Sequence, residues 1–223
     1  MKVFLKISLL ALFITATINA DAQKYAIEAG YTNPMQVTKI GSTTGSTTFF
    51  YGGKIGVTAR YSLKSNANAS LLTGVLYSLV YADRQSYGYP IGTGLTYKTT
   101  GHFIDIPIHA IYSLPISKNM SFFGYAGPTI NIGLAQNMKV TSTLTYSTAS
   151  PFYVKPGSFN VYNSGAGDYQ LNRLNLQIGV GGGIQWKKYQ LKSGYDFGIT
   201  NLNKADTGNL FQKGWYVSFS YQF

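Results

Sequence analysis

Few side chains in this sequence could carry out acid–base or metal chemistry. Its 223 residues include no Cys and only two His, His102 and His109. Hydrolysis requires a nucleophile, a base and a group that orients the base. His102 lies between Gly101 and Phe103, which supply neither a nucleophile nor an acid. No carboxylate cluster indicates a metal site, so we predict a protein that is not an enzyme and has no cofactor.

A second set of charged residues lies on the polar side of segments in which apolar and polar residues alternate. Alternation with period two is typical of a strand with one apolar face. If the strands close into a barrel with the apolar face outside, these charges point inward, where unpaired charges are costly. We predict a polar network that fills the lumen, with a gated ion path as the alternative. Its members are Glu28, Lys54, Arg60, Asp105, His109, Arg173, Lys192 and Asp196.

The glycine-rich stretch GVGGG at 179–183 is the nearest match to a nucleotide-binding motif. A dinucleotide site needs such glycines between a strand and the start of a helix. Here they lie within an alternating segment, so the nucleotide interpretation fails. We expect the glycines to relieve crowding or to permit strand coiling at the barrel wall.

Eight segments of the chain are predicted to be strands. Most are about nine to fourteen residues long, whereas strands of soluble proteins average roughly 5–6 residues and a tilted membrane-spanning strand needs about 9–11. The segments lie near residues 24–32, 53–64, 69–81, 102–114, 120–134, 173–186, 189–200 and 214–223.

The connections between these segments alternate between short and long. Short turns on one rim and long loops on the other are typical of outer-membrane barrels, with the long loops outside the cell. An even number of strands places both ends on the periplasmic rim. The predicted long loops are 33–52, 82–101, 135–172 and 201–213.

The sizes of the alternating residues indicate which face meets the lipid. Eight strands enclose just enough room for side chains, so small and polar residues suit the interior and bulky aromatic residues the exterior. Tyr25, Tyr31, Trp186 and Trp215 lie near segment ends, where aromatic girdles meet the headgroups. We predict an all-β fold, an antiparallel up-and-down transmembrane β-barrel of eight strands. A ten-stranded barrel that threads 135–172 through the membrane is the alternative.

The N-terminal residues predict export. Lys2 and Lys6 precede an apolar run at 7–18, and Ala20-Asp21-Ala22 fits an A-x-A cleavage site. We predict a signal peptide at 1–22 and an outer-membrane β-barrel domain at 23–223. The net charge is +11, and for an exported protein its counterparts are lipid headgroups and lipopolysaccharide phosphates rather than nucleic acid.

The chain ends in GWYVSFSYQF, with apolar residues at every second position up to the terminal Phe. This pattern resembles the recognition signal of outer-membrane barrels, which implies that the barrel-assembly machinery reads it. By that resemblance, Tyr221 and Phe223 carry most of the signal. Packing against lipid alone is the alternative explanation. The alternating residues are Trp215, Val217, Phe219, Tyr221 and Phe223.

The segments FIDIPIHAIYSLPI, SKNMSFFGYAGPTINIGL and NLQIGVGGGIQW resemble the PorT-like or porin-family outer-membrane β-barrel proteins. The resemblance implies an eight-stranded barrel in the outer membrane of a Gram-negative cell envelope. Members of that family usually have no known biochemical activity, although some serve secretion machinery for surface proteins. We predict a structural or interaction role.

The longest predicted loop, 135–172, combines Tyr with Ser, Gly and Asn, a composition suited to adaptable recognition. We therefore expect a monomeric barrel that binds a protein or another surface ligand through its extracellular loops, although a passive shield is the alternative for this loop. The alternative function is an accessory subunit of a secretion or assembly machine. A narrow channel and a lipid A-modifying enzyme are weaker alternatives.

Overall fold

The computed structural model describes residues 23–41, 43–63, 66–88, 93–142, 157–163, 170–204 and 208–223. The predicted signal peptide, 1–22, lies outside the described residues. Within the described ranges, no helix is long and apolar enough to cross a membrane.

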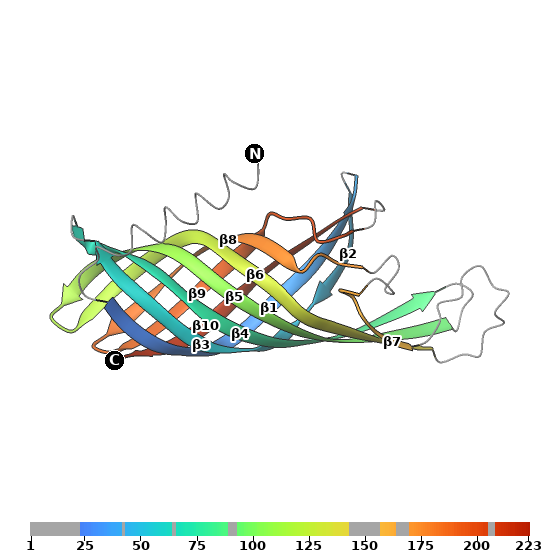
Figure 1. The fold of residues 1–223 in the computed structure, drawn as a ribbon, viewed down its shortest axis with the longest axis horizontal. Coiled ribbons are helices and arrows are strands. Elements are labelled where there is room, and N and C mark those ends of the chain that lie inside the picture. The colour runs from blue at the N-terminus through green and yellow to red at the C-terminus, as the bar shows by residue number, and fades with distance from the viewer. Residues whose placement is uncertain are drawn as a thin grey trace.

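Eight antiparallel strands close into a ring (Figure 1). Following the hydrogen-bonded neighbours, the ring order is β1, β3, β4, β5, β6, β8, β9 and β10, and β10 pairs with β1 to close it. The bounds are β1 Gln23–Ile40, β3 Tyr51–Leu63, β4 Asn66–Gly88, β5 Thr93–Ser117, β6 Met120–Ser142, β8 Leu174–Trp186, β9 Tyr189–Gly198 and β10 Asn209–Gln222. The predicted eight-stranded barrel is confirmed.

Two further strands lie outside the ring. β2 (Thr43–Phe49) pairs with β1, and β7 (Gly157–Asn160) pairs with β6. Because neither strand is inserted between two members of the ring, the ten-stranded alternative is wrong.

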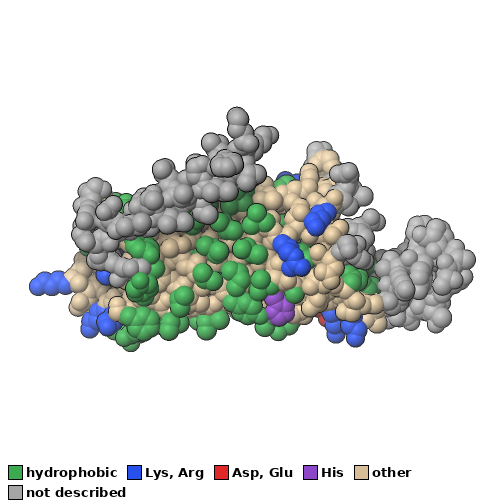
Figure 2. All heavy atoms as spheres, in the orientation of Figure 1, with side chains coloured by type: hydrophobic (Ala, Val, Ile, Leu, Met, Phe, Trp, Pro, Cys, Tyr) green, Lys and Arg blue, Asp and Glu red, His purple; other side chains and the backbone are tan. Residues whose placement is uncertain are grey.

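Burial alternates along each strand with the polar side inward. On β3, Lys54 and Thr58 are 9% and 5% exposed, whereas Ile55 and Val57 are 56% and 59% exposed. Figure 2 shows the result, with hydrophobic side chains over the middle of the barrel and Lys and Arg towards its two ends. The outer face is therefore the apolar one, as lipid requires.

The two rims differ as the connections predicted. Lys118–Asn119 and Lys187–Lys188 form tight turns on one rim, and Lys187 adopts a left-handed φ of 53° to close its turn. The start of β1 and the C-terminus lie at this same end (Figure 1). By the usual orientation of such barrels, this is the periplasmic rim.

On the opposite rim, two of the predicted loops are mostly strand, which corrects the predicted boundaries. β1 continues to Ile40 and is followed by β2, and β4 and β5 stay paired out to Gly88 and Thr93. The apolar alternation stops at the edge of the membrane, but Thr, Tyr and Val still favour the pleated backbone and the ladder continues in water. Alternation therefore revealed only the part of each strand that faces lipid.

The aromatic pairs Tyr31–Trp215 and Tyr51–Tyr81 mark the outer edge of the lipid-facing band, with ring centroids 5.4 Å and 6.4 Å apart. Beyond them the sheet extends on the order of 25 Å along its strands. The β3–β4 ladder reaches its outer end at Tyr51 and Tyr81. The extension therefore has two arms, one of β2, β1 and β10 and one of β4, β5, β6 and β7.

Candidate functional site

The centre of the barrel holds an ion pair between the Lys192 ammonium and the Glu28 carboxylate. Nζ lies 2.8 Å from Oε2, and the two side chains are only 5% and 1% exposed. Lys192 on β9 and Glu28 on β1 lie on either side of β10, where their register partners are Ser218 and Ser220. Because both intervening residues are small, the long Lys side chain can reach the carboxylate across β10.

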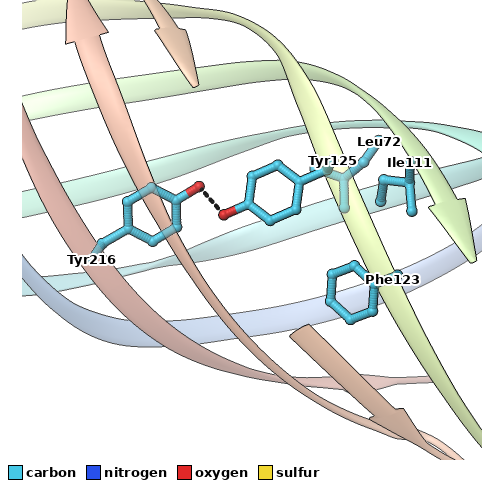
Figure 3. Packing of buried hydrophobic residues seen from close by; sticks show 5 residues of the cluster. All are labelled: Leu72, Ile111, Phe123, Tyr125 and Tyr216. Atoms are coloured by element: carbon cyan, nitrogen blue, oxygen red, sulfur yellow. Dashed lines mark hydrogen bonds between the residues drawn. The ribbon is translucent and has the colours of Figure 1, made fainter. Parts of the chain in front are cut away.

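Two tyrosines cross the lumen beside this pair. The Tyr125 and Tyr216 hydroxyl oxygens are 2.7 Å apart (Figure 3). The Lys54 ammonium lies 3.4 Å from the centroid of the Tyr216 ring, and His109 stacks on Tyr125 at 5.1 Å. A cation over an aromatic face is attracted by the ring quadrupole, most strongly when desolvated. The second buried cation therefore has an aromatic partner.

Apolar residues adjoin the tyrosines inside the barrel. Figure 3 shows Leu72, Ile111 and Phe123 packed in one cluster with Tyr125 and Tyr216. This packing places an apolar cluster directly beside the polar centre.

The remaining central acids are held by polar side chains or face a small cavity. Asp105 accepts hydrogen bonds from Ser78 Oγ at 2.7 Å and from Asn131 Nδ2 at 2.6 Å. His109 Nε2 lies 3.0 Å from Thr129 Oγ1. Asp196 lines a cavity of about 40 Å³, which has room for at least one water molecule.

The glycines of GVGGG make room for these large lumenal side chains. A Cβ at Gly181 would overlap the Tyr125 hydroxyl, and one at Gly183 would lie 2.6 Å from the Phe123 ring. We missed Phe123 and Tyr125 as lumenal residues in the sequence. The available signal was the glycines on the neighbouring strand β8, where Gly183 and Gly181 are the register partners of Phe123 and Tyr125.

Arg60 lies apart from the charged centre, towards the periplasmic rim. It donates hydrogen bonds to Ser70 Oγ at 2.7 Å, Ser113 Oγ at 2.7 Å and Gln185 Oε1 at 3.1 Å. Gln185 in turn donates to Gln222 Oε1 at 3.1 Å. At the periplasmic end, the lumen is thus crossed by the Arg60 guanidinium and the neutral side chains that accept its hydrogen bonds.

The prediction that Arg173 belongs to the lumenal network is wrong. β8 begins only at Leu174, so the alternation that would turn Arg173 inward does not reach it. Its exposed guanidinium donates to the carbonyls of Gly133 and Leu134 at 3.1 Å and 2.6 Å, and it lies 4.8 Å from the Tyr162 ring. Burial raises the pKa of the Tyr162 hydroxyl, opposed by the Arg173 charge. Arg173 therefore fastens an outer loop to β6.

Three glutamines cross the lumen at its outer end, which the sequence did not suggest. Gln36 Nε2 donates to Gln136 Oε1 and to Gln212 Oε1, both at 3.2 Å. Side-chain amides both donate and accept, so they can satisfy one another without a charge. This layer separates the charged centre from the outer mouth.

Above the glutamines, the two arms of the extension enclose a vestibule of about 350 Å³. Residues of the loop between β6 and β8 close one side of the vestibule. Val161 N donates to Gln136 O at 3.0 Å, and Leu171 N donates to Val161 O at 2.8 Å. Polar lining residues include Gln36, Thr38, Ser46, Thr48, Thr99 and Gln136. Apolar lining residues include Phe50, Ala82, Met138, Val161, Leu171 and Leu210.

The other predicted residues lie on the outer surface. His102 Nδ1 is 2.6 Å from the Tyr77 hydroxyl. Phe223 N donates to Tyr25 O at 2.9 Å, so the β1–β10 ladder continues to the last residue. Among the described residues, no three His, Cys, Asp or Glu side chains are grouped to hold a metal ion. The alternating C-terminal residues are exposed or half-buried on the lipid side: Trp215, Val217, Phe219, Tyr221 and Phe223.

The central ion pair predicts a strong energetic coupling. Glu28→Gln or Lys192→Met alone leaves one buried charge without its partner, so each should lower the free energy of unfolding by about 3–5 kcal/mol. The double variant removes both charges and should cost clearly less than the sum of the two. Urea unfolding of protein refolded in lipid vesicles measures this double-mutant cycle. Additive losses would show that the two residues do not stabilise each other.

Comparison with known proteins places this geometry in a family. No curated protein matches the sequence. Similar solved structures include Ail of Yersinia pestis in complex with the heparin analogue sucrose octasulfate, at 15% identity over 90% of this chain and 99% of that chain, with a TM-score of 0.35. Neisserial surface protein A (NspA) is 12% identical over 91% and 100% of the two chains, with a TM-score of 0.39. Outer membrane protease OmpT from Escherichia coli is 9% identical over 92% and 98%, with a TM-score of 0.46.

Identities and TM-scores this low support no argument about function, and the three proteins are named differently: an attachment invasion locus protein, a surface protein and a protease. The family model described as outer membrane protein beta-barrel domain matches residues 14–204. The chain belongs to this family and is an outer-membrane β-barrel protein.

Proposed function

We propose that this protein is a non-conducting, non-enzymatic barrel that binds a ligand or partner on the extracellular side. One observation carries the proposal. Side chains cross the lumen at several levels, while the strands continue past the aromatic girdle on one rim only and enclose a vestibule there. A barrel that served only as a membrane anchor would have no need for this extension.

The histidines support a role without catalysis. The ring of His102 faces outward onto the Tyr77 hydroxyl, and His109 is 3% exposed inside the lumen, stacked on Tyr125. His109 lies 3.0 Å from the Thr129 hydroxyl but is buried in the lumen without access to substrate, and His102 has no aliphatic hydroxyl or thiol among the partners described above. A base needs both a nucleophile and access to substrate.

The proposed binding surface differs from the predicted free loop. The first part of the predicted loop 135–172 is the end of β6, which runs to Ser142. Gln136 in this part belongs to the glutamine layer. We place recognition on the strands that line the vestibule and on the loop residues packed against them. On the outer face, Lys98 and Lys139 are register partners, which suits contact with lipopolysaccharide phosphates.

A second candidate is an accessory subunit of an outer-membrane machine, as the PorT-like resemblance implies. The observation that favours it is the edge of β2. Among the described residues β2 pairs only with β1, and its seven residues, TTGSTTF, include no charge and no Pro. Natural sheet edges are usually protected by such residues, and an unprotected edge can accept a strand from another chain.

Filling the vestibule should abolish ligand capture. Thr48 lines the vestibule, whereas Thr47 lies on the opposite face of β2. Nanodisc-embedded wild type and Thr47→Trp should retain the same material from envelope extract and culture fluid, and Thr48→Trp should lose most of it. Mass spectrometry and glycan analysis of the retained material measure the effect.

Equal capture by the Thr47→Trp and Thr48→Trp variants would contradict recognition at the vestibule. The identity of the material separates the two candidates. Capture of one envelope protein in a fixed molar ratio to the barrel would support the accessory-subunit candidate.

We also propose that the C-terminal alternation is an assembly signal. Phe223 is 65% exposed, and its ring makes an edge contact with Tyr221. Deleting Phe223 should therefore change the stability of refolded protein little, while insertion in cells should fall severalfold. Heat-dependent gel mobility of membrane fractions and of refolded protein measures the two effects. Losses of equal size would leave lipid packing as the explanation.

A further inference from the structure

We propose that the vestibule binds an uncharged saccharide, either free or as the terminal sugar of a larger glycan. This inference rests on the proposed extracellular binding function and specifies its ligand. It follows from the charge, the hydrogen-bonding groups and the shape of the lining.

The lining is almost free of charge, although the protein carries a net charge of +11. Arg84 is the single charged residue among the described lining residues, and its side chain is exposed. Other basic residues of the extension, Lys39, Lys98 and Lys139, are exposed and do not line the cavity. An anion would be recognised by clustered cations and a cation by carboxylates. This segregation therefore favours a neutral ligand.

The polar groups in the lining both donate and accept hydrogen bonds. Thr48, Thr99 and Ser46 contribute hydroxyls, and Gln36 and Gln136 contribute amides. A sugar hydroxyl also donates and accepts, so it can be satisfied by either kind of group. Apolar residues such as Met138 and Leu210 also line the cavity, and they suit the C–H faces of a sugar ring.

The shape favours a compact ligand over an extended peptide. A volume of about 350 Å³ lies near the lower end of the roughly 300–1,000 Å³ typical of ligand pockets. The polar groups come from β1, β2, β5 and β6 and so surround the cavity. A peptide would instead follow a strand edge through its backbone.

The test uses the full-length protein in nanodiscs and a panel of soluble probes. The panel contains glucose, galactose, mannose, N-acetylglucosamine and lactose, with glucuronate, glucosamine and N-acetyl-trialanine amide as comparisons. Saturation-transfer NMR and titration calorimetry should show at least one neutral sugar bound, with a Kd that does not change between 50 and 500 mM NaCl. The affinity for a charged ligand would fall over this range, because salt screens the attraction between charges.

Matched variants localise the site. Thr48→Val with Thr99→Val removes two lining hydroxyls at nearly constant volume and should weaken sugar binding at least about tenfold. Thr47→Val with Thr100→Val makes the same changes one residue away, on the outer face of the same strands, and should leave the affinity unchanged. Nanodiscs with and without lipopolysaccharide distinguish the two sources, because a glycolipid sugar in the vestibule would compete with the soluble probe.

Three results would overturn the inference: no neutral sugar bound below about 10 mM, equal affinities in the two double variants, or binding of only the peptide or the charged probes. If the Thr48→Trp variant still lost its captured material in any of these cases, extracellular binding would stand and only the ligand class would be wrong.

Discussion

Every backbone N–H and C=O group in the hydrocarbon core of a membrane needs a partner within the protein, and this constraint determines the rest of the structure. The chain meets it by pairing β10 with β1, from Ala26 opposite Gln222 to Lys39 opposite Asn209. With eight strands, closure leaves an interior only wide enough for side chains. The interior must then be filled, and the alternation of each strand decides what fills it.

The filling is mainly polar, with one apolar cluster beside the tyrosines, and the charges are accommodated differently at successive levels. Arg60 is surrounded by neutral groups, Lys192 is paired with Glu28, and Lys54 lies on the face of Tyr216. Charges in such surroundings are stable only with close partners. The small side chains Ser218 and Ser220 and the glycines of β8 are as necessary as the charges, because they give the long side chains room to meet. A lumen filled in this way leaves the extracellular extension as the place for recognition.

The sequence predicted the features that follow from contact with lipid. It missed features of the segments and side chains that do not face lipid. The apolar positions around Val57 and Phe219 revealed the number of strands and their inward phase, so Glu28, Lys54 and Lys192 could be placed inside. The alternation of short and long connections indicated the orientation in the membrane. The alternation of apolar and polar residues could not show that β1 continues to Ile40 or that β4 and β5 form a long hairpin, because those segments lie beyond the band of the barrel that faces lipid. Nor could it identify the glutamine layer, since Gln36, Gln136 and Gln212 are far apart in the chain and meet only through the register. The inward placement of Arg173 was wrong because the alternation of β8 was assumed to begin one residue before the strand does, at Leu174.

The central claim is that side chains close the lumen within the membrane, so that function lies outside it. Planar-bilayer recording of the purified wild type tests this claim most directly, with an open porin recorded in the same bilayers as the positive control. The account predicts no steady conductance for the wild type. A stable wild-type channel of defined size would contradict it.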